Sequence, residues 1–243
     1  MNTKNKEGAV LENIIRIENL KKSYGKNTVL DGISFNLGKG EITGLLGPNG
    51  SGKTTLIKII TGLIKDHEGQ VLIDSQKPGV HSKSLIAYLP DRSYLPDWMK
   101  PVDAINYFAD FFADFDKQKA LEIMPRFGVD LNQRLKTMSK GQQEKVNLIL
   151  VFCRKAKIYV LDEPLGGLDP AARGAILDFI VENRSEDSTI LLSTHLVNDI
   201  ESIFTRVLMI NSGKLIVNSD IDEIRKTGKS LEDVFKEVFP YVW

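Results

Sequence analysis

The sequence predicts an α/β fold built around a buried parallel β-sheet. Four strand-length segments are apolar at successive rather than alternating positions: residues 42–46, 85–89, 158–161 and 190–192. Strands that are apolar on both faces are typical of parallel sheets covered by helices on each side. Each segment is followed directly by polar residues, and open parallel sheets bind ligands beyond the carboxyl ends of their strands. We therefore expect one α/β domain with its functional site at that edge of the sheet.

The first third of the chain is rich in β segments and the middle is helical. Residues 14–20, 28–37 and 71–73 have strand character and are separated by turns that contain glycine. Between residues 94 and 145 the apolar residues follow helical spacing, which predicts a helical subdomain inserted between two strands. One apolar stripe of this subdomain is expected to hold Phe108, Phe111, Phe112 and Phe115, followed by Leu121, Met124 and Phe127. From residue 220 onward we expect two short helices around Gly228.

Composition and charge limit the possible functions. The chain has 243 residues, and its 32 basic residues balance 32 acidic ones, so it lacks the basic excess of a protein that wraps nucleic acid. We therefore expect no nucleic-acid partner. Cys153 is the one cysteine, which excludes an intrachain disulfide and favours a reducing compartment. Residues 1–12 contain no apolar signal-peptide core and no run of about 18 apolar residues occurs, so we expect a cytoplasmic protein without a membrane span.

Residues 47–54 match the phosphate-binding pattern G-x-x-x-x-G-K-[ST], directly after a predicted buried strand and before a predicted helix. Glycines allow such a loop to turn its N–H groups inward around an anion. The positive N-terminal end of the following helix further stabilises the negative charge of the anion. Lys53 would neutralise the β- and γ-phosphates, and the Thr54 hydroxyl would bind Mg²⁺. The helix is expected to end near Gly62 and to bury Leu56, Ile59, Ile60 and Leu63. The expected phosphate-binding residues are Gly47, Pro48, Asn49, Gly50, Ser51, Gly52, Lys53, Thr54 and Thr55.

Polar residues that follow the other predicted strands are candidates for the same site. Asp162 is placed to hold Mg²⁺, and Glu163 beside it can accept a proton from an attacking water. His195 can hydrogen-bond a γ-phosphate and hold the water and Glu163 in register. The alternatives are two solvated acids that open a loop and a structural histidine. Asp91 can approach Mg²⁺ or the water from a further strand, but an aspartate after Pro90 is also typical of a turn, and both interpretations stay open.

Residues 138–142 give the strongest indication of a family. Ser139 and Gln142 have the spacing of a helix-capping box, ahead of a helix whose apolar face holds Val146, Ile149, Leu150 and Cys153. The stretch Met-Ser-Lys-Gly-Gln also resembles the L-S-G-G-Q signature of ABC-type ATPases, and it lies just before the strand that ends at Asp162, as in that family. Other motifs match in order: Tyr24 resembles the aromatic A-loop, residues 89–91 the Q-loop region, residues 166–169 the D-loop and residues 193–195 the H-loop. The resemblance covers about residues 14–214.

The resemblance implies a fold, a domain division and an activity. The fold is that of a P-loop NTPase of the ABC cassette type, with a RecA-like core, an N-terminal antiparallel β subdomain and an inserted α-helical subdomain. Residues 1–243 would form a single cassette with its core at 13–91 and 147–218, the helical subdomain at 92–146 and a helical tail at 219–243. The implied activity is ATP hydrolysis, with ATP and Mg²⁺ as cofactors. Its catalytic residues would be Glu163, His195 and Asp91, and its metal ligands Thr54, Asp162 and Asp91.

Cassettes of this family close as a head-to-tail dimer. Each ATP then lies between the Lys53 loop of one subunit and the Ser139 loop of the other, and a capped helix start is itself an anion site. The residues expected to contact ATP in this way are Ser139, Gly141, Gln142 and Asp169. Asp169 before Pro170 is equally a good helix N-cap, and both roles are compatible. Tyr24 is expected to stack under the adenine, with a turn aromatic as the alternative.

Two residues depart from the family pattern. Asp91 stands where the family usually has Gln, or Glu in some exporter-type cassettes. An acidic residue at this position is expected to alter either the interaction with Mg²⁺ or the link to the membrane partner. Lys140 replaces the first Gly of the signature pair and adds a positive charge near the expected γ-phosphate.

The resemblance also implies partners. The chain resembles the ATPase subunit of a transporter, peripheral on the inner face of the cell membrane, whose integral membrane permease is a separate chain and whose second cassette completes a homodimer or heterodimer. Residues 94–99 with Tyr107 and Phe108 are the candidate docking segment, in which Trp98 and Met99 are expected to face the partner.

The end of the chain favours one direction of transport. Residues 229–235 resemble the S-L-E-[DE]-V-F tail of cassettes paired with exporter-type (ABC-2) permeases, which favours export. The alternatives are a soluble ABC ATPase that acts on ribosomes or DNA and a nucleotide-gated regulator. Cargo and the preference for ATP over GTP stay open.

Overall fold

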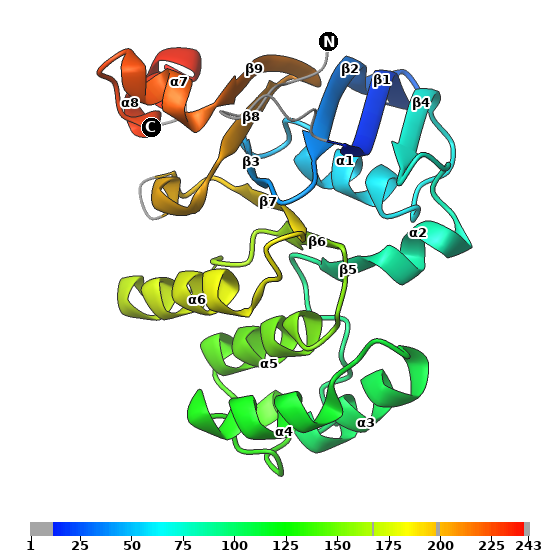
Figure 1. The fold of residues 1–243 in the computed structure, drawn as a ribbon, viewed down its shortest axis with the longest axis vertical. Helices are drawn as coiled ribbons and strands as arrows, with labels where there is room; N and C mark the ends of the chain where they lie inside the picture. The colour runs from blue at the N-terminus through cyan, green and yellow to red at the C-terminus, as the bar shows by residue number, and fades with distance from the viewer. Residues whose placement is uncertain (1–11, 167, 198–199, 241–243) are drawn as a thin grey trace.

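A six-stranded sheet forms the centre of the molecule, with strand order β5-β6-β7-β3-β8-β9 (Figure 1). The computed structural model describes residues 12–166, 168–197 and 200–240. The strands of this sheet are β3 (Ile42–Leu46), β5 (Ile86–Leu89), β6 (Ile158–Asp162), β7 (Thr189–Thr194), β8 (Arg206–Asn211) and β9 (Lys214–Asp220). β5, β6, β7, β3 and β8 run parallel, so the parallel arrangement predicted for the four apolar segments is confirmed. Their carboxyl ends therefore lie at one edge.

Two strands extend the sheet beyond the predicted four. β8 pairs in parallel with β3, and β9 returns antiparallel along β8. β9 alternates exposed and half-buried residues, as is typical of an edge strand with one face toward solvent, so it has no continuous apolar run. β8 is fully buried from Arg206 to Ile210, and its apolar residues 207–210 resemble those of the predicted strands.

The N-terminal third of the chain forms a second sheet of three antiparallel strands, in the order β2-β1-β4. Its strands are β1 (Asn13–Tyr24), β2 (Asn27–Gly38) and β4 (Glu68–Ile73). α1 (Lys53–Ile60) packs between the two sheets, since its apolar residues share one buried cluster with β1, β2, β4 and one face of the central strands (Figure 1). The antiparallel β subdomain is thus present.

The buried face of α1 agrees with the prediction except at Leu63. Leu56, Ile59 and Ile60 are completely buried, whereas Leu63 is 58% exposed. The helix ends at Ile60, and Gly62 adopts φ +71°, a left-handed conformation in which glycine reverses the chain. Helical periodicity therefore does not extend to Leu63, and its assignment to the buried face was wrong.

Helices form the other side of the central sheet and the lower part of Figure 1. They are α3 (Pro101–Phe111), α4 (Lys117–Arg126), the short 3₁₀ helix η1 (Leu135–Thr137), α5 (Lys140–Phe152) and α6 (Pro170–Asn183). α2 (Val80–Leu85) lies above these helices at the right of Figure 1 and leads directly into β5. α5 packs on α3, α4, α6 and β5. Its residues 146–152 are buried throughout, so α5 connects the helical layer to the sheet.

Three of the four phenylalanines predicted to form one apolar stripe do pack together. The ring of Phe108 lies 5.2 Å from that of Phe112 and 5.4 Å from that of Phe115, with both partners packed on the core. Phe111 is 67% exposed and its ring lies 4.4 Å from that of Tyr107 instead. Phe111 is the last residue of α3 and lies four positions after the exposed Tyr107, whereas the buried face of the helix holds Ala104, Ile105 and Phe108. The assignment of Phe111 to the core was wrong.

Of the two residues expected to face a partner, only Trp98 is exposed. Its exposed fraction is 64%, and Tyr94, Tyr107 and Phe111 are exposed nearby in the sequence or on α3. Met99 is buried because its backbone N–H donates to Pro96 O and its carbonyl accepts from the N–H of Leu135, which turns the side chain into the core. The expectation that Met99 faces outward was wrong.

The chain ends in two short helices, as predicted. α7 (Ile221–Lys226) and α8 (Leu231–Val238) flank Gly228, which has φ +75°. A 3₁₀ turn, η2 (Glu201–Ile203), precedes β8. Within the described ranges, no helix has both the length and the apolar character that crossing a bilayer requires.

Candidate functional site

The residues that follow β3, β5, β6 and β7 line one cavity of about 550 Å³. Most of the predicted site residues meet there, as the topology requires. They are Asn49, Gly50, Ser51, Gly52, Lys53, Thr54, Thr55, Asp91, Glu163 and His195. Val29, on β2, also lines the cavity; it carries no polar signal and could not have been found from sequence.

The loop between β3 and α1 has a backbone that requires glycine. Gly47 has φ +152°, and a Cβ at this position would lie 2.3 Å from the carbonyl oxygen of Ile210. Gly52 has φ +110°, and its Cβ would lie 2.9 Å from the carbonyl oxygen of Val29. Both positions combine a left-handed backbone with no room for a side chain. Gly52 is also the N-cap of α1, so the N-terminal N–H groups of this helix lie at the cavity.

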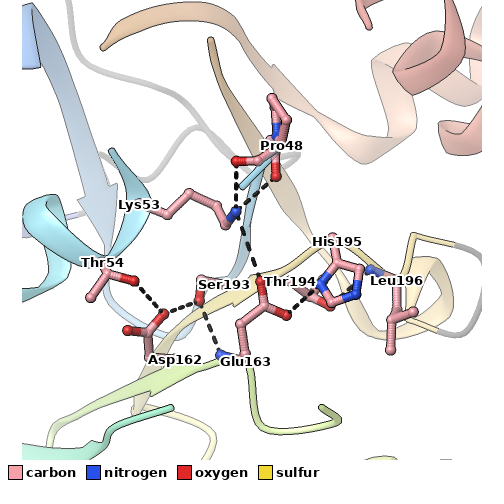
Figure 2. A network of polar contacts seen from close by, with 10 residues as sticks. Pro48, Lys53, Thr54, Asp162, Glu163, Ser193, Thr194, His195 and Leu196 are labelled. Carbon is pink, nitrogen blue, oxygen red and sulfur yellow. Dashed lines mark hydrogen bonds and ion pairs between the residues drawn. The ribbon is translucent and has the colours of Figure 1, made fainter. Parts of the chain in front are cut away.

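Lys53 lies inside this loop with its charge largely enclosed (Figure 2). Its Nζ donates to the carbonyl oxygens of Gly47 at 2.7 Å and Pro48 at 3.2 Å, and lies 3.8 Å from Glu163 Oε1. Burial lowers the pKa of the Lys53 ammonium, and the carboxylates of Glu163 and Asp162 oppose this effect. A bound anion would also raise the pKa of Lys53, because it favours the charged ammonium as these carboxylates do.

Asp162 ends β6 as an almost completely buried carboxylate. Its Oδ1 accepts a hydrogen bond from Ser193 Oγ at 2.5 Å and a long one from Thr54 Oγ1 at 3.5 Å (Figure 2). Its Oδ2 is buried with no hydrogen-bond partner among the residues described. A buried carboxylate oxygen without a partner next to a hydroxyl fits the oxygen ligands that Mg²⁺ prefers. The pair Thr54 and Asp162 therefore suits the predicted metal site.

Glu163 is held in an unusual backbone conformation beside His195. It has φ +52°, and its N–H is shared between the carbonyl and the hydroxyl oxygen of Ser193, each at 3.1 Å. Its side chain accepts a hydrogen bond from His195 Nδ1 at 2.9 Å (Figure 2). Burial raises the pKa of Glu163, while His195 and Lys53 oppose the shift. A carboxylate with a raised pKa beside a lysine and a histidine is suited to accept a proton.

Ser193 is a site residue to which sequence analysis assigned no separate role. It sits on β7 directly across from Asp162 in the parallel register, so strand pairing places its hydroxyl between the two acids. The sequence shows it only as the first residue of the H-loop motif.

The remaining predicted residues do not line the cavity of their own chain. Ser139 and Gln142 form the predicted capping box of α5: Ser139 Oγ accepts from Gln142 N–H at 3.3 Å, and Gln142 Oε1 accepts from Ser139 N–H at 3.1 Å. Asp169 caps α6, since its Oδ1 accepts from the N–H of Ala172 at 2.9 Å. A Cβ on Gly141 would lie 3.3 Å from the side chain of Leu168, which brings the two loops together. Gly167 of the predicted D-loop lies outside the described residues.

Asp91 lines the cavity, whereas Tyr24 is not among the residues that line it. Tyr24 ends β1, is half exposed, and has the Nζ of Lys22 at 4.9 Å from its ring centroid. Asp91 is exposed and lines the cavity, and a second cavity of about 330 Å³ extends from it to Lys140 and Glu144 at the start of α5. The Q-loop region and the start of the Ser139 helix thus face one another.

Comparison with known proteins establishes the family. The ABC transporter family model matches residues 30–166, more than half of the chain. An uncharacterized ABC transporter ATP-binding protein of Methanocaldococcus jannaschii is 35% identical over 241 residues, covering 93% of this chain and 87% of the relative. This chain belongs to the ABC transporter family. It is an ATP-binding cassette and an ABC-type ATPase.

Two further similarities describe the cassette more closely. A lantibiotic transport ATP-binding protein of Streptococcus pyogenes is 28% identical over 224 residues, covering 91% of the cassette and 96% of the relative. The solved structure of an ATP binding subunit of an ABC transporter is 27% identical, with a TM-score of 0.82 over 92% of the cassette and 98% of that chain. The predicted fold class, a P-loop ABC cassette, is therefore confirmed.

Proposed function

We propose that the cassette hydrolyses ATP at the cavity between the glycine loop and Glu163 and thereby drives export through a separate membrane permease. The observation that supports it most is the convergence of Lys53, Glu163 and His195, joined by distances of 3.8 Å and 2.9 Å, beside the buried Asp162. This arrangement supplies a cation for the phosphates, a base and a hydrogen-bonding partner within one cavity.

The chain's own residues divide the chemistry between them. The loop N–H groups and Lys53 bind the phosphates, and Glu163 accepts the proton of the attacking water. His195 donates to Glu163 and orients it, with its ring free to reach a γ-phosphate because the side chain is half exposed. Thr54 and Asp162 would hold Mg²⁺, which neutralises charge on the phosphate oxygens when bound. Asp91 is a further candidate to contact the metal or the water.

The second half of each nucleotide site would come from another cassette. Ser139, Gly141 and Gln142 lie at a well-formed helix N-terminus that does not line the cavity of its own chain. Such a terminus favours an anion, and a γ-phosphate held by the partner cassette supplies one. ATP would then favour the closed dimer and hydrolysis would reopen it. Tyr24 would stack on the adenine, and Asp169 would act at the same dimer contact in addition to capping α6.

The helical segment, proposed as residues 92–146, would carry the contact with the permease. Trp98, Tyr107 and Phe111 expose aromatic surface in this segment, and aromatic side chains are enriched at protein interfaces. The lantibiotic transport relative and the Ser230-Leu231-Glu232-Asp233 tail both favour an export partner. The cassette would lie on the inner face of the membrane.

Purification of the tagged full chain from detergent-solubilised membranes tests this proposal. Recovery with an integral membrane subunit supports transport, and Trp98→Ala combined with Phe111→Ala should weaken that recovery while ATP binding is kept. Recovery with ribosomes or DNA instead would contradict it.

A further inference from the structure

Lys22 and Tyr24 lie at the end of β1, opposite the part of β2 that forms a wall of the nucleotide cavity. The antiparallel register pairs Lys22 with Leu30 and then shifts by one residue, so Val29 is the extra residue of a bulge beside Lys22. Val29 lines the cavity, and a Cβ on Gly52 of the glycine loop would lie 2.9 Å from its carbonyl oxygen. The same end of the hairpin therefore carries Val29, Lys22 and Tyr24.

The Lys22 side chain is buried, and its ammonium is held by a carboxylate. Its exposed fraction is 7%, and its Nζ donates to Asp66 Oδ2 at 2.9 Å. Asp66 is almost fully exposed and lies in the connection between α1 and β4. An ion pair with an exposed carboxylate contributes little to stability, whereas ordering a lysine side chain costs conformational entropy. The fold itself thus gains little from a cation at this position.

The second contact of the ammonium is with the ring of Tyr24. The Nζ of Lys22 lies over this ring, 4.9 Å from its centroid, within the range of a cation–π interaction. Among the residues that the structure describes, Lys22 is the one recorded side-chain partner of the ring. Tyr24 is half exposed, so without the lysine its ring would change rotamers freely. One face of the ring is thus covered by a fixed cation, and the other face is available to a planar ligand.

We propose that Lys22 is a positioning residue for nucleotide binding: its ammonium, fixed by Asp66, holds the Tyr24 ring in the orientation in which it stacks on the purine base. The inference rests on the proposed role of Tyr24 under the base. The negative faces of two stacked rings repel each other, and a cation on the far side of the tyrosine opposes that repulsion. Because stacking does not read the edge of a base, Lys22 acts on adenine and guanine nucleotides alike.

Titration calorimetry of the full chain with ADP tests the effect of Lys22, since ADP carries the base and is not hydrolysed. Lys22→Met keeps the buried stem and removes the ammonium, whereas Lys22→Arg keeps a cation over the ring. Lys21→Met is the control, because it removes an exposed charge from the same strand. Lys22→Met should bind ADP about three- to fivefold more weakly than wild type, and Lys22→Arg and Lys21→Met should stay within about twofold of it.

Two further measurements separate positioning of the ring from a general effect on the cassette. Inorganic pyrophosphate presents phosphates to the Lys53 loop without a base, so its affinity, measured by displacement of ADP, should be unchanged in Lys22→Met. GDP should lose as much affinity as ADP. In a Tyr24→Ala background, Lys22→Met should cause no further loss of ADP affinity, because the ring through which the lysine acts has been removed.

The possible results distinguish this inference from the proposed function. Wild-type ADP affinity of Lys22→Met, with weakened binding by Tyr24→Ala, would overturn the role of Lys22 and keep that of Tyr24. An equal loss of affinity for ADP and pyrophosphate would also overturn it, since the lysine would then act on the phosphates or on the fold. Unchanged ADP binding by Tyr24→Ala would instead contradict the role of Tyr24 in the proposed function.

Asp66→Ala tests the same contact if thermal denaturation shows that Lys22→Met is not folded. The substitution lies at an almost fully exposed position and removes the carboxylate that fixes the ammonium. It should weaken ADP binding and leave pyrophosphate binding unchanged. Wild-type affinity of Asp66→Ala for ADP would then overturn the inference.

Discussion

Ser193 joins the two acids of the nucleotide site: its hydroxyl donates to Asp162 Oδ1 at 2.5 Å and accepts from the backbone N–H of Glu163 at 3.1 Å. One side chain on β7 thus orients the proposed metal ligand and the proposed base, which are consecutive residues at the end of β6. The Ser193 hydroxyl thus orients both the Asp162 carboxylate and the backbone of Glu163. The parallel register of β6 and β7 holds Ser193 opposite Asp162.

Ser193→Ala should destabilise the cassette and weaken its response to Mg²⁺. The change leaves Asp162 Oδ1 with only the long contact to Thr54, and a buried acceptor that loses its donor costs about 1–3 kcal/mol. Urea denaturation should show a decrease of that size in the free energy of unfolding. Ser84→Ala, which removes an exposed hydroxyl, is the matched control and should leave stability unchanged. Equal stability of Ser193→Ala and wild type would contradict the proposed importance of this contact.

Glu163→Gln should bind ATP but hydrolyse it about 10²–10⁴ times more slowly, because an amide cannot accept the proton of the attacking water. The variant should also accumulate as a dimer with ATP, which sedimentation velocity can measure. Glu182→Gln, on the exposed face of α6, is a control that should keep wild-type turnover. Normal hydrolysis by Glu163→Gln would exclude Glu163 as the base.

The rate of hydrolysis should fall in acid with a midpoint above the ordinary glutamate pKa of about 4.3. Burial raises the pKa of Glu163, so its carboxylate takes up a proton, and stops acting as a base, at a higher pH than an exposed glutamate does. His195 opposes this shift, so His195→Ala should move the midpoint to still higher pH as well as lower the rate. The measurement is kcat as a function of pH for both proteins. An acid limb that stays in place or moves to lower pH in the variant would show that His195 does not act on Glu163.

Lys53→Ala should weaken ATP binding by about 10- to 100-fold, since hydrogen bonds to charged groups contribute about 1.5–3 kcal/mol. The loop loses the cation that its carbonyls now hold in place. Titration with a fluorescent ATP analogue measures the affinity, and Lys58→Ala on the exposed face of α1 serves as the control. Unchanged affinity in Lys53→Ala would mean that the lysine does not contact the nucleotide.

The parts of the site that follow directly from strand ends could be predicted from sequence. Apolar strands followed by Asp162-Glu163 and by His195 indicate where the sheet places those side chains, because parallel strands share one edge. The contribution of Ser193 to the site depends on which strands are neighbours and on their register. Neither can be predicted from the sequence of one strand. Val29 reaches the cavity from the other sheet, again through tertiary packing.

Errors in burial came from places where a helix stops. Leu63 has the right spacing for a buried face, but α1 ends at Ile60, so the period of 3.6 residues no longer applies to it. Phe111 is the last residue of α3 and lies on the exposed face with Tyr107. The prediction that Met99 is exposed was wrong because a backbone hydrogen bond to the distant Leu135 helps to set the direction of its side chain. The hydrogen bond from the Leu231 N–H to Glu201 Oε2 joins residues 30 apart in sequence, and only the folded chain reveals it.

A crystal structure of the assembled Glu163→Gln complex with ATP tests most directly whether two cassettes share each nucleotide. The decisive quantity is the distance from Ser139 Oγ to the nearest γ-phosphorus. We expect Ser139 within about 4 Å of the γ-phosphorus of ATP bound by the other cassette, as a hydrogen bond to a phosphate oxygen requires. A complex in which ATP occupies the Lys53 loop while Ser139 contacts no nucleotide would contradict the account.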